Sequence, residues 1–145
     1  NMLANSRRTV YLGTQTAGII ASGGPPAPGN QAAYNYDGTN WTAAGVSANN
    51  ALSGRVGIGT ASAGLLISGT APYTSGQNSE LWNGTAFAND AVTATQRSSS
   101  QSSSASPVSS GYVTGGSNST TPGTALTSTE EYTATVAANL NITTS

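Results

Sequence analysis

Few residues in this chain could carry out chemistry, and their types limit what that chemistry could be. Among its 145 residues there is no histidine, cysteine or lysine, and there are five acidic and four arginine side chains. Without imidazole or thiolate groups, this segment can build neither a Ser/His/Asp triad nor a copper centre on imidazole ligands. Paired carboxylates remain as the acid–base option, and the acids available are Asp37, Glu80, Asp90, Glu130 and Glu131.

The positions of these acids favour structural roles. Asp37 precedes a glycine in an expected hairpin turn, where aspartate is common for backbone reasons. Glu80, Glu130 and Glu131 fall where a strand is expected to begin, and we expect them to cap that strand or to form local hydrogen bonds. We therefore expect a protein that is not an enzyme, with no catalytic residues, no cofactor and no metal ion.

Charge and hydropathy exclude further classes of function. Charged residues make up 6% of the chain, against roughly 25% in ordinary globular proteins, and the net charge is -1. Four scattered arginines cannot form the basic stripe that binds nucleic acid. No run of 18 apolar residues occurs, so we expect no membrane insertion. Absence of cysteine excludes a disulfide framework and leaves an extracellular location open.

The elements that must position these residues follow a repeat. Segments 19–24, 65–70 and 111–116 are similar and lie 46 residues apart, and each places a glycine after a short apolar run. The pattern Tyr36-Asp37-Gly38-Thr39-Asn40-Trp41 recurs 46 residues later as Trp82-Asn83-Gly84-Thr85-Ala86-Phe87. A period of this size is typical of repeat proteins, in which one unit cannot bury its apolar face alone.

Each unit is expected to contain four short antiparallel strands. In the first unit these are 9–12, 17–22, 32–36 and 41–43, and helical periodicity is nearly absent. Asp-Gly and Asn-Gly between the last two strands predict a hairpin whose two central residues both have positive φ. In the third unit, about four residues are expected to be inserted within 117–128. The serine-rich stretch 98–106 is expected to form a poorly packed first strand.

Four antiparallel strands in about 46 residues, with a double glycine after the second, match a β-propeller blade. The units resemble kelch repeats through an opening arginine, the double glycine and two spaced aromatics. The matching positions in the first unit are Arg8, Gly23-Gly24, Tyr36 and Trp41. We therefore expect an all-β fold of three kelch-like blades, at approximately 6–50, 51–96 and 97–145, forming a partial or oligomer-completed propeller.

The sequences of some segments resemble a narrower variety of these repeats. The segments 13–17, 83–85 and 129–132 are similar to kelch-like propellers associated with virion proteins of bacteriophages, notably marine phages. This resemblance implies a structural or adhesion module of a virus particle, located in a virion or outside the cell. The alternative is a secreted carbohydrate-binding, lectin-like propeller, and an enzyme is a distant third.

Candidate functional residues fall into two groups. Aromatics at repeat-equivalent positions are expected to pack between adjacent blades; these are Tyr36, Trp41, Trp82, Phe87 and Tyr132. Polar and aromatic residues in or beside the irregular loops could bind a glycan by stacking and amide hydrogen bonds; these are Asn30, Gln31, Tyr73, Gln77 and Asn78.

The number of units predicts partners. Propellers close with roughly four to eight blades, because closure removes exposed sheet edges, and three units are too few. We expect either two copies that form a six-bladed ring, further blades of a longer parent chain, or an open stack capped by neighbouring subunits. The chain begins with Asn1, so we expect a processed or partial segment. Virion subunits or a host glycan are further candidate partners.

Overall fold

The structure is a computed structural model of the chain. It describes residues 8–21, 23, 31–69, 77–90, 93, 95–97, 100–102, 107–118, 124–134 and 140–144. Asn30 and Tyr73, two of the predicted glycan-binding residues, lie outside these ranges.

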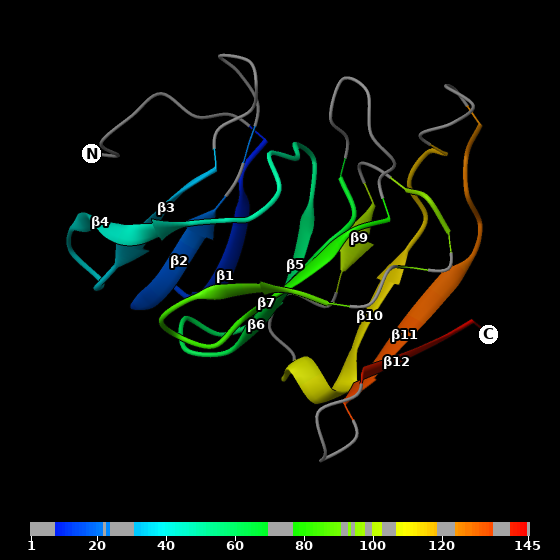
Figure 1. The fold of residues 1–145 in the computed structure, drawn as a ribbon. Coiled ribbons are helices and arrows are strands. Elements are labelled where there is room, and N and C mark those ends of the chain that lie inside the picture. Colours follow the sequence, from blue (N-terminus) through cyan, green and yellow to red (C-terminus); the bar gives the residue numbers. More distant parts are fainter. Residues whose placement is uncertain are drawn as a thin grey trace.

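The described residues form three four-stranded antiparallel sheets, which follow one another in chain order (Figure 1). The first sheet contains β1 (Val10–Thr14), β2 (Ala17–Ala21), β3 (Ala32–Tyr36) and β4 (Trp41–Ser47). The second contains β5 (Val56–Gly59), β6 (Gly64–Ile67), β7 (Ser79–Trp82) and β8 (Phe87–Asn89). The third contains β9 (Gln101–Ser102), β10 (Gly111–Thr114), β11 (Thr129–Ala134) and β12 (Leu140–Thr144).

The all-β expectation is confirmed. One short 3-10 turn, η1 (Val108–Ser110), precedes β10, and the described residues contain no α-helix. None of their helical segments is long and apolar enough to cross a membrane. The weak first strand expected in the serine-rich stretch corresponds to β9, which is two residues long.

The hairpins between third and fourth strands are present, but the predicted turn type is wrong. Tyr36 pairs with Trp41, and Trp82 pairs with Phe87, so four residues connect the strands in each case. Only the glycines have positive φ, at 93° in both Gly38 and Gly84. The Asp37 carboxylate supplies the rest of the turn by accepting hydrogen bonds from the backbone N–H groups of Thr39 and Asn40, at 2.8 and 2.7 Å.

The third unit departs from the 46-residue period in its second strand as well as in its loop. Strand pairing makes Gly18, Gly64 and Gly111 equivalent, because they face Tyr36, Trp82 and Tyr132 respectively. Gly111 thus lies 47 residues after Gly64, and Tyr132 lies 50 residues after Trp82. The insertion between them is three residues rather than about four, and within this region Ser117 and Ala125 form an isolated antiparallel bridge.

Neighbouring sheets pack by placing an aliphatic side chain against a glycine. The first strands of consecutive sheets lie side by side, with β1 next to β5 and β5 next to β9 and β10. A Cβ atom at Gly64 would collide with Leu12 Cδ1 of the first sheet, and a Cβ at Gly111 would lie 2.5 Å from Ile58 Cδ1 of the second. Because glycine has no side chain, it leaves the hole that the aliphatic side chain fills.

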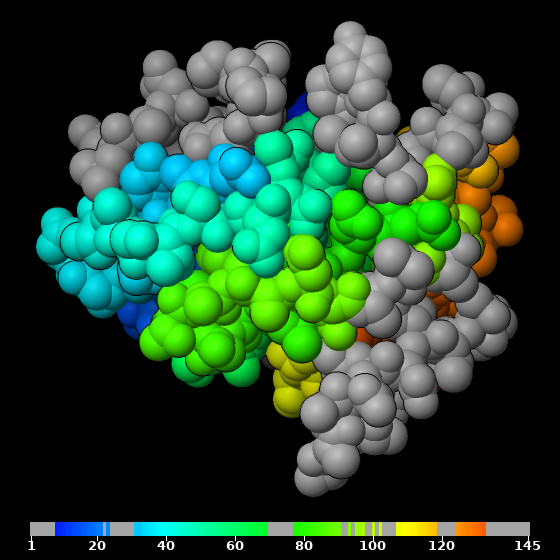
Figure 2. Space-filling view, in the orientation of Figure 1, coloured from blue at the N-terminus to red at the C-terminus, as the bar shows by residue number. Residues whose placement is uncertain are grey.

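Two apolar clusters form the core, one at each junction between sheets. The cluster between the first and second sheets comprises Val10, Leu12, Ile19, Ala21, Ala33, Leu66, Trp82 and Phe87. The cluster between the second and third comprises Ile58, Leu65, Ile67, Val113 and Tyr132. All four residues of β6 are buried, since β6 contributes to both clusters. At the surface, β4 lies beside β8 (Figure 2), where Ala44 and Val46 pack against the first cluster.

Candidate functional site

The second and fourth strands of each sheet end at one side of the three sheets, and the third strands begin there. We call this side the loop edge. Gln31, Gln77 and Asn78, the predicted glycan-binding residues that the structure describes, precede third strands and therefore lie at the loop edge.

At the loop edge, the structure shows Gln31 and Gln77 binding the chain's own connectors. Gln31 Nε2 donates to the carbonyl oxygen of Asn49 at 2.9 Å, and Gln77 Nε2 donates to that of Thr93 at 3.1 Å. Their backbone oxygens accept from Ala48 and Thr93 N–H groups, both at 2.8 Å. These repeat-equivalent glutamines therefore fasten each connector to the sheet that precedes it.

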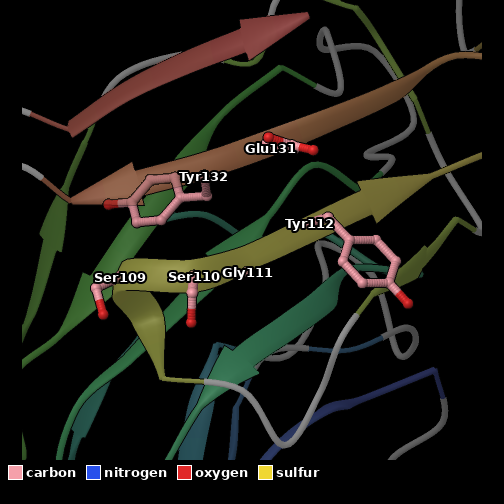
Figure 3. A pocket seen from close by; sticks show the side chains of 6 residues that line it. All are labelled: Ser109, Ser110, Gly111, Tyr112, Glu131 and Tyr132. Carbon is pink, nitrogen blue, oxygen red and sulfur yellow. The ribbon is translucent and has the colours of Figure 1, made fainter. Parts of the chain in front are cut away.

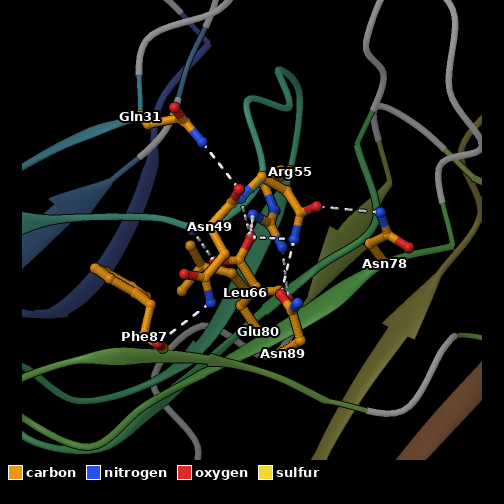
Figure 4. A network of polar contacts seen from close by, with 9 residues as sticks. Gln31, Asn49, Arg55, Leu66, Asn78, Glu80, Phe87 and Asn89 are labelled. Atoms are coloured by element: carbon orange, nitrogen blue, oxygen red, sulfur yellow. Dashed lines mark hydrogen bonds and ion pairs between the residues drawn. The ribbon is translucent and has the colours of Figure 1, made fainter.

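The connector between the first two sheets is held from the other side by a buried carboxylate (Figure 4). Glu80 of β7 has no exposed surface and forms an ion pair with Arg55. It also accepts hydrogen bonds from the backbone N–H groups of Asn49, at 2.6 Å, and Asn50, at 3.1 Å. Burial lowers the pKa of Arg55, and the negative charge of Glu80 opposes that shift.

The third sheet repeats this arrangement with different residues. Glu130 of β11 is buried and accepts from Arg97 Nη2 at 2.5 Å and from the backbone N–H of Thr95 at 3.1 Å. Arg97 also donates to the carbonyl oxygen of Gly115 at 3.0 Å. In each case an arginine from the incoming connector meets a glutamate from the third strand, and together they hold the connector against the sheet.

The two arginines reach equivalent glutamates from different sequence positions. By strand pairing, Gln101 is equivalent to Val56, so Arg55 precedes its strand by one residue and Arg97 precedes it by four. The position of Arg55 is occupied by Ser100 in the third unit, and the position of Arg97 is occupied by Leu52 in the second. Leu52, Arg55, Arg97 and Ser100 are all buried, so each large residue is matched by a smaller or apolar one.

The first sheet has neither partner. Tyr34 occupies the position of Glu80 and Glu130, and Arg8 is exposed. The opening arginine expected in these units thus forms a buried pair in the second and third units, as Arg55 and Arg97.

The remaining acids are divided between local structure and the surface. Asp37 closes its hairpin turn, and those two backbone hydrogen bonds lower its pKa. Asp90 accepts a hydrogen bond from the Tyr132 hydroxyl at 3.0 Å. Burial, and secondly the charge of Asp90, raise the pKa of Tyr132. Glu131 is exposed on the third sheet. No group of three or more metal-ligating side chains occurs in the part of the chain that the structure describes.

A small polar pocket of about 120 Å³ opens at the loop edge. It is lined by Asn50, Asn78, Ser79, Asn89 and Asp90. Asn78 Nδ2 donates to Asn50 Oδ1 at 3.3 Å, and Asn50 Nδ2 donates to Asn89 Oδ1 at 3.1 Å. Asn78, a predicted glycan-binding residue, thus lines this pocket. Asn50 and Asn89 were not predicted, because single asparagines carry no distinctive sequence signal.

The predicted repeat aromatics divide by position. Trp82, Phe87 and Tyr132 are buried in the two clusters between sheets, with the Trp82 and Phe87 rings 4.5 Å apart. Tyr36 and Trp41 form the equivalent ring pair in the first sheet, 4.8 Å apart, but belong to neither cluster and are half-buried. They lie on the face of the first sheet that points away from the second.

A groove larger than the amide pocket opens on the face of the third sheet that points away from the second sheet (Figure 3). This groove has a volume of about 390 Å³ and is lined by Ser109, Ser110, Gly111, Tyr112, Glu131 and Tyr132. Tyr112 is paired across the strands with Glu131, and its side chain is 45% exposed. The equivalent pair in the second sheet is Leu65 and Leu81, and Leu65 is fully buried against the third sheet.

Comparison with known proteins gives a fold and no family. Neither a family model nor a curated protein matches this chain. Among solved structures 106 chains match, including one titled "Structure of YjhT", with a TM-score of 0.76 and 13% sequence identity. The alignment covers 99% of this chain and 47% of that one, so this chain spans about half the length of that structure. At this level of identity the likeness shows the fold alone.

Proposed function

We propose that this chain is a segment of a kelch-like β-propeller that serves as a non-catalytic structural and adhesion module of a virus particle. Three consecutive four-stranded sheets with adjacent first strands support the propeller arrangement. The viral setting is supported by the resemblance of its repeats to those of phage virion proteins. In this proposal the sheets are a rigid scaffold, and the loop edge contacts other virion subunits or a host glycan.

The observation that carries the non-catalytic part is the internal use of the acids. Of the five carboxylates, Glu80 and Glu130 are buried in ion pairs, Asp37 closes a turn, and Asp90 accepts from Tyr132. The remaining carboxylate is Glu131, which lies on the face of the third sheet that points away from the second sheet. Carboxylate catalysis needs two groups that face one substrate, and this arrangement favours a scaffold over an enzyme.

Mass spectrometry of purified particles tests the structural role. The chain or its parent should be present at a stoichiometry that matches a symmetric assembly. Its absence from particles, when it is present in the infected cell, would contradict the proposal.

The small amide pocket favours a second candidate function, carbohydrate binding. Its asparagine amides offer both hydrogen-bond donors and acceptors and Asp90 adds an acceptor, which are groups that can bind the hydroxyls of a sugar. A glycan array tests this candidate with the natural chain and with Asn89→Ala, since Asn89 is exposed at the pocket rim. Specific hits that Asn89→Ala abolishes, and that Tyr112→Ala in the distant groove retains, would support it; hits equally lost in both would contradict it.

A further inference from the structure

The three-sheet stack has two outward faces, and the size of the side chains on them differs from that at the junctions inside the stack. We call the outward face of the first sheet the front face and that of the third sheet the rear face. The two exposed large hydrophobic side chains among the described residues are Tyr11, 37% exposed on the front face, and Tyr112, 45% exposed on the rear face.

Inside the stack, each junction pairs a large side chain on the earlier sheet with small residues on the later one. Leu12 packs at Gly57 and Gly64, where added Cβ atoms would lie 2.5 Å from Leu12 Cδ2 and in collision with Leu12 Cδ1, respectively. At the next junction, Ile58 packs at Gly111, and Ser102 donates from Oγ to the Gly57 carbonyl oxygen at 2.8 Å. At both junctions the later sheet has a small residue at the same position, Gly57 in the second sheet and Ser102 in the third.

On the front face, Tyr11 occupies the position that Gly57 and Ser102 occupy in the later sheets. Strand pairing places Tyr11 opposite Ile20, as Gly57 lies opposite Leu66 and Ser102 opposite Val113. A Cβ at Gly18 would collide with the Tyr11 ring, so this ring fills the hole that Leu12 fills at Gly64. The Tyr11 hydroxyl donates to the Thr14 carbonyl oxygen, which fixes the ring across the sheet.

On the rear face the described residues leave a hollow. The groove of about 390 Å³ opens beside Tyr112 on this face. The rear face therefore offers a recess, whereas Leu12 and Ile58 fill the equivalent space at the inner junctions.

We infer that the front face of one copy docks on the rear face of a second copy, with the exposed ring of Tyr11 packing at the groove beside Tyr112. A large side chain on one face thus meets a recess on the other, as Leu12 and Ile58 meet glycines at the inner junctions. Charge also matches, because Arg8 is exposed beside the front face and Glu131 is exposed on the rear face. Front and rear surfaces differ, so the contact is head-to-tail and closes a ring when the rotation permits. This inference deepens the proposed scaffold function by naming its partner.

Analytical ultracentrifugation of the natural chain and two variants tests it. Tyr11→Arg blocks the front face and Tyr112→Arg blocks the rear face, and both positions are exposed, so the variants should fold; circular dichroism checks this. The natural chain should associate into species of at least twice 14.3 kDa, and each variant alone should sediment at 14.3 kDa. An equimolar mixture should regain a one-to-one dimer, because one front face and one rear face remain intact.

Three results would overturn the inference. The natural chain could remain at 14.3 kDa at every concentration, the mixture could remain monomeric, or one variant could dimerise alone, which would indicate a symmetric contact between like faces. The experiment contains no glycan and no virus particle, so its failure would leave the proposed adhesion role untouched.

Discussion

At the scale of single residues, the buried carboxylates hold the molecule together. Glu80 and Glu130 each bind an arginine and the backbone of an incoming connector, and all four charged side chains are fully buried. A buried charge that loses its partner is costly, because the remaining charge is neither solvated nor paired. These pairs therefore specify where each connector lies.

Glu80→Ala should destabilise the fold by about 3–5 kcal/mol, since it leaves Arg55 and the Asn49 and Asn50 N–H groups without their acceptor. Replacing Arg55 with leucine in the same chain should recover only part of the loss, because the N–H groups remain unsatisfied. Urea unfolding followed by tryptophan fluorescence measures both. Glu131→Ala is the matched control and should change stability by less than about 0.5 kcal/mol; equal effects of the two substitutions would contradict this role.

Asp37 gives a prediction about pH. Its folded-state pKa lies below the ordinary value of 3.8, so its contribution to stability is present above that value and is lost as pH falls through the folded-state pKa. Asn83 closes the equivalent turn through its amide oxygen, at 2.9 Å from Thr85 N and 2.8 Å from Ala86 N. Asp37→Asn should therefore keep the turn and lack the acid-dependent loss.

Thermal melts of the natural chain and Asp37→Asn across acidic pH test this. The natural chain should lose more melting temperature than the variant on acidification below pH 3.8. Parallel curves would show that the side-chain hydrogen bonds do not couple to the protonation of Asp37.

At the scale of elements, glycine at the sheet junctions sets how closely two sheets approach. Gly64→Ala should cost about 1–3 kcal/mol, because the new methyl group overlaps Leu12 inside a packed core. Gly111→Ala should behave similarly against Ile58. Neither glycine has a positive φ, so the effect comes from packing rather than from backbone strain.

Gly18→Ala is the matched control at the same register position. Its methyl group would meet the ring of Tyr11, which is partly exposed and can move aside into solvent. It should cost less than Gly64→Ala in the monomer, as measured by chemical denaturation at low protein concentration. An equal cost would mean that Tyr11 is as tightly confined as Leu12.

Sequence patterns predicted the strands well and the register of the third unit poorly. Asp-Gly and Asn-Gly located the hairpins, yet the turn depends on the side-chain oxygen of Asp37 or Asn83, which a rule about φ does not include. The glycine pair after the second strand was aligned one residue early in the third unit. Ser68 takes φ 56° and Gly115 takes φ 62°, so these two are equivalent although only one is glycine.

The candidate site was predictable only in part. Gln31, Gln77 and Asn78 were correctly placed in or beside loops, but sequence could not show that Gln31 and Gln77 bind the connectors, because these contacts span 16 to 18 residues. Inter-sheet packing was predicted for five aromatics, and three lie in the clusters. Tyr36 and Trp41 do not, because no described sheet lies in front of the first one.

At the scale of the whole molecule, the second sheet is covered by a described sheet on both faces, and the first and third sheets are so covered on one face. The backbone amides of Leu66 and Ile67 in β6 should therefore exchange with solvent more slowly than those of Ile20 and Ala21 in β2. Hydrogen exchange monitored by NMR at low protein concentration measures this. If β2 exchanges as slowly as β6 in the monomer, the stack unfolds as one unit and the order of the sheets has no effect on local stability.

The displaced arginines have a consequence for engineering. In the second unit Arg55 binds the glutamate and Leu52 fills the other position, whereas in the third unit Arg97 binds the glutamate and Ser100 fills the other position. The unit that can be exchanged is therefore the whole connector and not a single residue. Residues 48–55 and 93–100 should transplant between units as intact cassettes, whereas an alignment-guided swap of one residue would bring two arginines, or none, to one glutamate.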